Sequence, residues 1–309
     1  MSIDMSARLT FITPAFCAGA DPAKAEVRAP AIRGQLRWWF RVLGGTPDQE
    51  KKLFGGVHNG TQASKVTVRV RDLDERTADG ARELPKPNTP VYYLSHFARV
   101  SGNRERYNKD AWFNIDTSFT VDAFSRLSMS ADEERAFREA WETFLLLGSL
   151  GLRQTRGFGA FSPQEHPSET QIIDRLKALK AKGIRSWYLT PLNSKEVGTV
   201  SDWLDCLMLL EATLAHLRQH GFSAQNNSTP LGNAKPRQAS GLHLRPILVE
   251  GGKWMPVLFY VSKVVDNPSI GCECDLLKLL DSRPEVRYPY KQRASKPETR
   301  KAISVLTVQ

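Results

Sequence analysis

The strand and helix patterns of this sequence are repeated in one order, and this repetition restricts the fold more than any other feature. The first half predicts a strand at 7–13, a helix from Pro30 to Gly44, strands at 64–72 and 112–121, a helix starting at Ser130, and a short strand in GFGAFS. After a connecting helix at 169–182, the second half predicts the strand IRSWYLT, a helix at 202–220, the strands LHLRPILV and WMPVLFYV, the helix DLLKLLD and the strand AISVLTV.

Each half therefore has the order β-α-β-β-α-β, which is typical of ferredoxin-like domains. We predict an α+β chain of two ferredoxin-like (βαββαβ, RRM-like) domains, at residues 1–165 and 166–309. Local signals agree with this order, because Ser130 and Glu133 form a capping box and E-G-G-K predicts a hairpin turn between two strands. The stretch 74–110 predicts mostly loop, with one strand pattern in VYYLSHFA.

Positive charge is concentrated in three parts of the chain, whose net formal charge is +10. Residues 27–47 hold four arginines and no acid, 212–249 hold four basic residues and no acid, and 283–301 hold seven basic residues and two glutamates. Clustered positive charge is the electrostatic footprint of a polyanion such as nucleic acid. The alternative is a solvated basic surface without a partner.

The sequence lacks the features of a membrane protein, a secreted protein or a zinc-binding protein. The chain has no apolar run of about 18 residues and no secretion signal at its start, so we expect a cytoplasmic protein without a membrane partner. Cys17, Cys206, Cys272 and Cys274 lack the paired C-x-x-C sets of a zinc site and predict buried free thiols. We expect no cofactor and no metal.

The helix in APAIRGQLRWWFRVLGG carries two different faces. At about 100° per residue, Arg33, Arg37 and Arg41 fall within about 80° of arc, while the apolar stripe, which includes Trp39, lies on another side. Like charges at i,i+4 and a glycine in the interior, Gly34, both disfavour a helix. Tolerance of both features predicts that a phosphate approaches this face beside Gly34.

Trp38 lies just beyond the arginines and need not be buried, so a base could stack on it. The alternative for the arginines is pairing with carboxylates from elsewhere in the fold, and the two interpretations are compatible.

The stretch GLRQTRGFGAF, 151–161, is a second candidate for RNA contact. The candidate residues are Arg153, Arg156, Gly157, Phe158 and Gly159. The glycines let backbone N–H groups approach a phosphate closely. The stretch is not a P-loop, and it departs from the RRM motif after R-G-F-G, which excludes a conventional RRM platform. The alternative is a tight turn with two solvated arginines.

The segments FITPAFCAGADPAKAEVRAPAIRGQLRWWFR, KLFGG, SKVTVRV and GLRQTRGFGAF resemble the first-numbered RAMP subunit of the type III-B CRISPR Cmr effector complex, and GNAKPRQASGLHLRP, 232–246, resembles its C-terminal half. The resemblance implies two ferredoxin-like domains and a place near the 3′ end of the guide RNA. It implies contacts with guide RNA, target RNA and other RAMP subunits in antiviral defence. Lys235 and Arg237 join the candidate RNA-binding residues through this segment.

The resemblance implies a non-catalytic subunit, because target cleavage in such complexes is attributed to the repeated backbone subunit. The alternative is a metal-independent guide-processing endoribonuclease, for which His58 in FGGVHNG is a weak candidate and His96 a weaker one. A third hypothesis is a structural cap that leaves RNA to its neighbours. His216 and His220 predict a solvated helix face, and we expect no metal at Asp116 or Asp122.

Overall fold

The computed structural model describes most of the chain, and its backbone forms two compact units. The described residues are 2–57, 60–75, 91, 94, 112–191, 198–220, 231–232, 240–261, 270–282, 284–288 and 301–307, with the backbone alone at 191, 270–275, 285–288, 301–304 and 306–307. The first unit comprises Met1–Lys86, Ser95–Gln154 and Phe158–Pro167, and the second Pro87–Leu94, Thr155–Gly157 and Ser168–Gln309.

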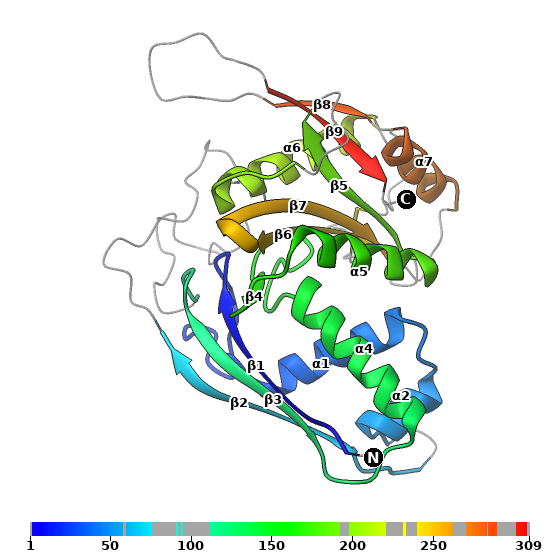
Figure 1. The fold of residues 1–309 in the computed structure, drawn as a ribbon. Coiled ribbons are helices and arrows are strands. Elements are labelled where there is room, and N and C mark those ends of the chain that lie inside the picture. The colour runs from blue at the N-terminus through cyan, green and yellow to red at the C-terminus, as the bar shows by residue number, and fades with distance from the viewer. Residues whose placement is uncertain are drawn as a thin grey trace. The chain divides into compact units, whose positions relative to one another are not determined.

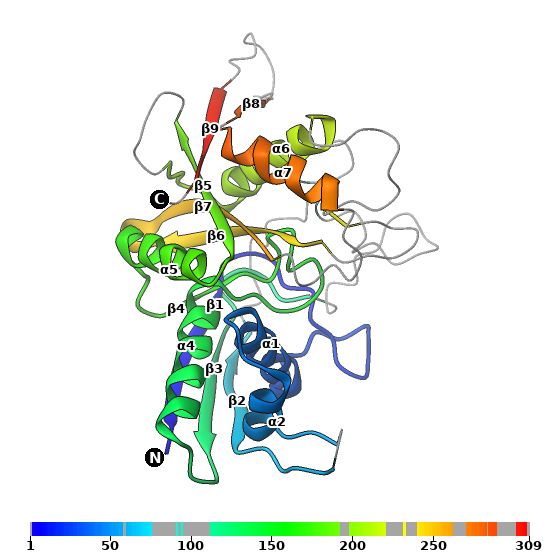
Figure 2. The same ribbon diagram turned by 90° about the vertical axis from the view of Figure 1, so that its right-hand side faces the viewer.

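The first unit is an antiparallel sheet with helices on one face (Figures 1 and 2). Its strands are β1 (Asp4–Phe11), β2 (Val66–Asp74), β3 (Ser118–Ser125) and β4 (Phe161–Pro163). Its helices are α1 (Ala29–Val42), α2 (Pro47–Phe54) and α4 (Ala131–Leu147). The strands lie in the order β2-β3-β1-β4, and every neighbouring pair is antiparallel.

Strand alternation separates the core of this unit from a polar sheet face. On β3, Phe119 and Val121 are fully buried and point to the helices, together with Leu9 of β1, which pairs with Phe119. Successive strand residues point to opposite faces, so Thr120 and Asp122 lie on the side away from the helices. The helices contribute the other half of the core. Each fully buried aromatic or aliphatic side chain stabilises the fold by about 1.5–3 kcal/mol relative to leaving it exposed.

The second unit is a five-stranded sheet in the order β6-β7-β5-β9-β8, again antiparallel throughout. Its strands are β5 (Arg185–Pro191), β6 (Leu242–Val249), β7 (Lys253–Tyr260), β8 (Glu285–Tyr288) and β9 (Lys301–Thr307). Its helices are α5 (Glu169–Ala181), α6 (Trp203–His220) and α7 (Ile270–Asp281), and a 3-10 turn, η2 (Glu250–Gly252), joins β6 to β7. The helices α6 and α7 lie beside each other on one side of this sheet (Figures 1 and 2).

The structure confirms the α+β prediction and the predicted order of elements, with three differences. The short helix α2 was not predicted, although Thr46 and Gln49 form a complete capping box at its start. The strand expected at 112–121 begins only at Ser118, and β8 was not expected. The strand pattern in VYYLSHFA lies largely outside the described residues. Within the described residues, no helix is long and apolar enough to cross a lipid bilayer.

Candidate functional site

The predicted arginine face of α1 exists, and the apolar stripe beside it holds the helix on the sheet. Pro30 starts the helix at a position where a missing N–H costs nothing. Ile32, Leu36 and Trp39 are buried, as the spacing predicted. The arginine row therefore lies on the outer side of a helix whose other side is fixed in the core.

The alternative interpretation, in which carboxylates from elsewhere in the fold pair with these arginines, is confirmed for Arg37 and Arg41, because α2 supplies Glu50. Arg37 Nε donates a hydrogen bond of 2.7 Å to Glu50 Oε1, and its Nη2 lies 2.6 Å from the same oxygen. Arg41 Nε lies 3.6 Å from Glu50 Oε2. The partner was missed because α2 was missed, and the capping box T-P-D-Q in the sequence was the signal that could have revealed it.

Arg33 is bound within the protein. Its Nη2 donates a hydrogen bond to the backbone oxygen of Phe54, the last residue of α2. Burial, and then the neighbouring charge of Arg37, lower the pKa of Arg33 from its usual value. A cation at a helix C-terminus is favourable, so Arg33 holds α2 against α1, and its contact with a phosphate stays a prediction.

The exposed part of the row lies around Arg41. Its side chain is 55% exposed, and among the described residues its two Nη groups have no hydrogen-bond acceptor. Gly34 is exposed, and a Cβ added there would meet no atom within 4 Å. Trp38 is half-buried and lies edge-on to Trp39, with 4.7 Å between ring centroids. The structure thus brings an arginine edge, an open glycine and an aromatic ring onto one helix surface.

Arg156 is a correction to the predicted RNA contacts, because it is buried at 4% exposure. Its Nη1 donates hydrogen bonds to Ser240 Oγ at 3.1 Å and to the backbone oxygen of Leu242 at 3.3 Å. Its Nη2 donates to the backbone oxygen of Leu231. The guanidinium N–H groups that were expected to bind a phosphate are therefore hydrogen-bonded within the protein. Through these bonds Arg156 joins the segment 155–157 to the rest of the second unit.

The glycines that follow serve protein packing instead of phosphate approach, which corrects a second prediction. Gly157 and Gly159 are buried with φ of 87° and 66°, and a Cβ would collide with Leu207 at the first position and with the Leu150 backbone oxygen at the second. Phe158 is fully buried against Phe16, at 5.5 Å between centroids, so it cannot stack on a base.

Arg153 is the member of the glycine-rich stretch that remains a candidate contact. It is half-buried, next to the exposed Leu152, and its φ of 60° lies in the left-handed region. A non-glycine residue seldom adopts this conformation, and such strain is concentrated at functional positions. Arg153 therefore keeps its place in the candidate site.

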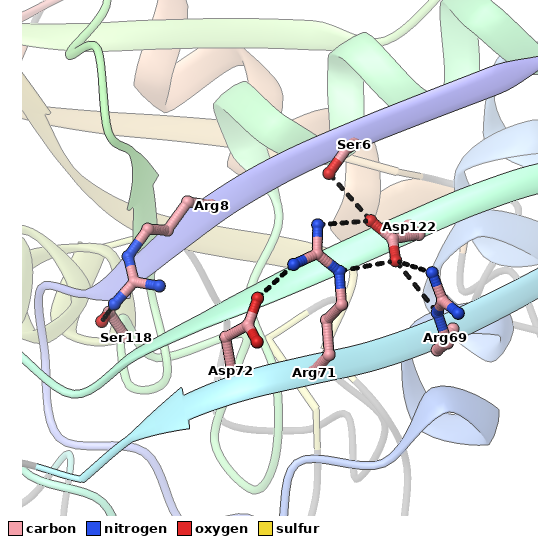
Figure 3. Close-up of polar contacts among 7 residues, drawn as sticks. All are labelled: Ser6, Arg8, Arg69, Arg71, Asp72, Ser118 and Asp122. Carbon is pink, nitrogen blue, oxygen red and sulfur yellow. Dashed lines mark hydrogen bonds and ion pairs between the residues drawn. The ribbon is translucent and has the colours of Figure 1, made fainter.

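A second arginine cluster, not predicted from the sequence, lies on the polar face of the first sheet (Figure 3). Asp122 of β3 is 8% exposed, and its Oδ2 accepts hydrogen bonds from Arg69 Nη2 at 2.8 Å and Arg71 Nε at 2.9 Å. Ser6 of β1 donates to its Oδ1 at 2.8 Å. The signal was present in the strand SKVTVRVRD, where alternation puts Arg69 and Arg71 on the face opposite the valines.

The electrostatics of this cluster make Asp122 a poor ligand for a metal ion. The hydrogen bonds from Arg71, helped by those from Ser6 and Arg69 and opposed by burial, hold the pKa of Asp122 well below its usual range. An aspartate that is already shared between two guanidinium groups has no free lone pair directed at a cation. Among the described residues, no cluster of three or more histidine, cysteine or acidic groups could hold a metal ion.

The remaining predicted residues divide into two groups. Lys235, Arg237, His58 and His96 lie outside the described residues, so their roles stay predictions. His216 and His220 lie on the outer side of α6 with ring centroids 4.5 Å apart, as expected for a solvated helix face. Burial and the neighbouring His220 lower the pKa of His216.

Cys17 and Cys206 are free and buried, as predicted, and burial raises the pKa of Cys17 to about 12.

Comparison with known proteins places this geometry in a family. A family model described as the RAMP superfamily matches residues 8–162, which include both α1 and the glycine-rich stretch. The CRISPR system Cmr subunit Cmr1-2 of Pyrococcus furiosus is 30% identical over 177 residues, 50% of this chain and 92% of that protein. Subunit Cmr1-1 of the same organism is 27% identical over 157 residues, 47% of this chain and 42% of that protein.

Solved structures share the fold at low sequence identity. The crystal structure of Cmr1 from Pyrococcus furiosus in its apo form gives a TM-score of 0.53 at 18% identity, covering 89% of this chain and 96% of that one. A chain in the cryo-EM structure of the type III-B Cmr-beta bound to cognate target RNA gives 0.52 at 13% identity, covering 90% and 99%. At these identities the likeness extends to the fold over most of both chains.

Proposed function

The chain belongs to the RAMP superfamily, and we propose that it is an RNA-binding subunit of a type III-B CRISPR ribonucleoprotein. In this role it binds guide and target RNA near the 3′ end of the guide, contacts other RAMP subunits of a Cmr complex, and serves antiviral RNA-targeting defence in the cytoplasm. The support is the sequence similarity to two Cmr1 proteins and the similarity in fold to a chain of a target-bound complex.

The single observation that carries the RNA contact is the exposed edge of Arg41, on the helix face that also holds Gly34 about two turns earlier. A guanidinium offers paired N–H groups that match a phosphate, and the missing side chain at Gly34 leaves the same helix face open to an approaching strand. Arg37 flanks this position and Trp38 offers a ring on which a base stacks. Arg153 is a further contact, and Lys235 and Arg237 extend the proposal to the segment 232–246.

The domain organisation is part of the same proposal. The sheet order β2-β3-β1-β4 is the ferredoxin-like order when read along the first half of the chain. In the second half, the order β6-β7-β5-β9 repeats it, with β8 added at the edge. We therefore divide the chain into two ferredoxin-like domains at 1–165 and 166–309, with residues 155–157 packed in the second unit.

A matched pair of substitutions tests the RNA contact. Arg41 and Arg69 are 55% and 62% exposed, and each is paired with one buried carboxylate. Arg41→Gln and Arg69→Gln therefore remove the same charge from similar environments. We expect Arg41→Gln to weaken the binding of a labelled single-stranded RNA about tenfold, since a hydrogen bond to a charged group contributes about 1.5–3 kcal/mol.

Arg69→Gln should leave affinity within about twofold of the unchanged protein, because a distant charge acts through screened electrostatics alone. Equal effects of the two substitutions, in fluorescence anisotropy titrations at one salt concentration, would contradict the proposed site.

The same samples test the endoribonuclease alternative. After long incubation in EDTA, RNA that stays full-length on a denaturing gel supports a non-catalytic subunit, and cleavage that requires His58 contradicts it.

A further inference from the structure

Glu50 holds two arginines of the proposed RNA contact at once. Its side chain is 7% exposed, whereas those of Arg37 and Arg41 are 37% and 55% exposed. Oε1 accepts the hydrogen bond from Arg37 Nε, and Oε2 lies 3.6 Å from Arg41 Nε. The carboxylate is thus on the protein side of both guanidinium groups, and the Nη groups of Arg41 remain without an acceptor among the described residues.

This arrangement sets the net charge of the three side chains. Two guanidinium groups and one carboxylate leave a net charge of +1, and a phosphodiester group carries a charge of −1. A single internal phosphate of an RNA strand therefore balances the charge of these three side chains. Because Glu50 is buried and held by α2, the phosphate does not have to displace it.

The arrangement also lowers the entropy lost on binding. A free arginine side chain has about 2 kcal/mol of rotamer entropy to lose. Arg37 and Arg41 have already lost part of theirs in the free protein, because Glu50 binds both. Side chains that are ordered before binding give higher affinity than side chains that must be ordered by the ligand.

We propose that Glu50 is a positioning residue for RNA, which holds Arg37 and Arg41 side by side so that both guanidinium groups reach one phosphodiester. The inference rests on the proposed function and extends it in one unexpected direction. An acidic side chain strengthens the binding of a polyanion, because its effect on arginine geometry exceeds its electrostatic repulsion.

Two substitutions separate geometry from charge. Glu50→Gln removes the charge and keeps the size of the side chain, and Glu50→Asp keeps the charge and shortens the side chain. We expect both to raise the Kd for a labelled oligouridine about fivefold, as expected from the loss of arginine ordering. The measurement is fluorescence anisotropy of the full chain, at a temperature where circular dichroism shows each variant folded.

Asp122→Asn is the matched control, since Asp122 is also a buried carboxylate shared by two arginines. It raises the net charge by the same amount as Glu50→Gln and should not weaken RNA binding. A combined variant adds a second control. In an Arg41→Gln background, Glu50→Gln should lose most of its effect, because only one arginine remains to be positioned.

Each other outcome overturns the inference in a distinguishable way. Tighter binding by Glu50→Gln with no change in Glu50→Asp would make Glu50 a simple repulsive charge. No change in either variant, while Arg41→Gln still loses affinity, would remove the positioning role and leave the proposed function standing. No change in any of the three variants would remove both.

Discussion

Two carboxylates of the first unit each hold two arginines, and the two clusters differ in how closely acidic groups pair with the guanidinium groups. On the sheet, Asp122 binds Arg69 and Arg71 at 2.8–2.9 Å, and Arg71 pairs in addition with Asp72. On the helices, Glu50 binds Arg37 closely but lies 3.6 Å from Arg41. The sheet cluster includes a second acid, Asp72. The helix with Arg37 and Arg41 instead carries Gly34, where an added Cβ would meet no atom within 4 Å.

The comparison teaches that a row of arginines in a sequence does not by itself define a nucleic-acid site. Both clusters contain exposed guanidinium groups over a buried carboxylate. The sheet cluster is closely compensated, so it stabilises the pairing of β1, β2 and β3. The helix cluster keeps an excess positive charge and unused N–H groups, which are the requirements for binding a phosphate.

The largest expected difference between the clusters is in stability. Asp122→Asn should lower the free energy of unfolding by about 1.5–3 kcal/mol, because charge-assisted hydrogen bonds from Arg69 and Arg71 are lost. Glu50→Gln should lower it by about 1–2 kcal/mol, since Gln still accepts one hydrogen bond from Arg37. Urea unfolding followed by circular dichroism measures both. A smaller effect at Asp122 than at Glu50 would reverse the assignment of the structural and the functional cluster.

Acid should act on the sheet cluster in a defined direction. The pKa of Asp122 is lowered in the folded chain by hydrogen bonds from Arg71. A carboxyl with a depressed folded pKa contributes stability that is fully present above its unfolded value, about 3.9, and is lost as the pH falls toward the folded value. The unfolding free energy should therefore decrease below about pH 4 in the unchanged protein, and less steeply in Asp122→Asn. Parallel curves for the two proteins between pH 4 and pH 2 would show that this pair contributes nothing.

Gly34→Ala should change stability and RNA affinity in opposite directions. The helix interior accepts a Cβ there without contact, and alanine is favoured over glycine by about 1 kcal/mol. The same methyl group fills part of the open helix face along which the proposed RNA strand approaches Arg41, so RNA affinity should fall severalfold. Thermal unfolding and an RNA titration on one preparation check both signs. A more stable variant with unchanged affinity would show that RNA does not approach Gly34.

The smallest expected effect is on salt dependence. Each phosphate contact with a single strand contributes about 0.7 to the slope of log K against log salt concentration. Arg41→Gln should reduce this slope by about that amount, and Arg71→Gln should leave it unchanged. Titrations between about 50 and 300 mM salt measure the slopes, and an equal reduction in both variants would place RNA on the sheet as well.

The sequence by itself determined the order of the elements and the two faces of α1. Period-2 and period-3.6 patterns, capping boxes and turn glycines act over a few residues, so Ser130 could be assigned as a helix start and Trp39 as a core residue. Continuous segments of the first half, such as GLRQTRGFGAF, also carried the resemblance to the RAMP family. These signals are local in the chain and need no knowledge of tertiary neighbours.

Only the tertiary structure decided which arginines are exposed and which are bound within the protein. The acceptors of Arg156 lie 75–86 residues further along the chain, and Arg37 meets its carboxylate on a different helix. Exposure and ion pairing depend on such distant neighbours, which local patterns do not encode. For the same physical reason, Gly157 and Gly159 were interpreted as sites of phosphate approach, although the groups that approach them are Leu207 and the Leu150 backbone.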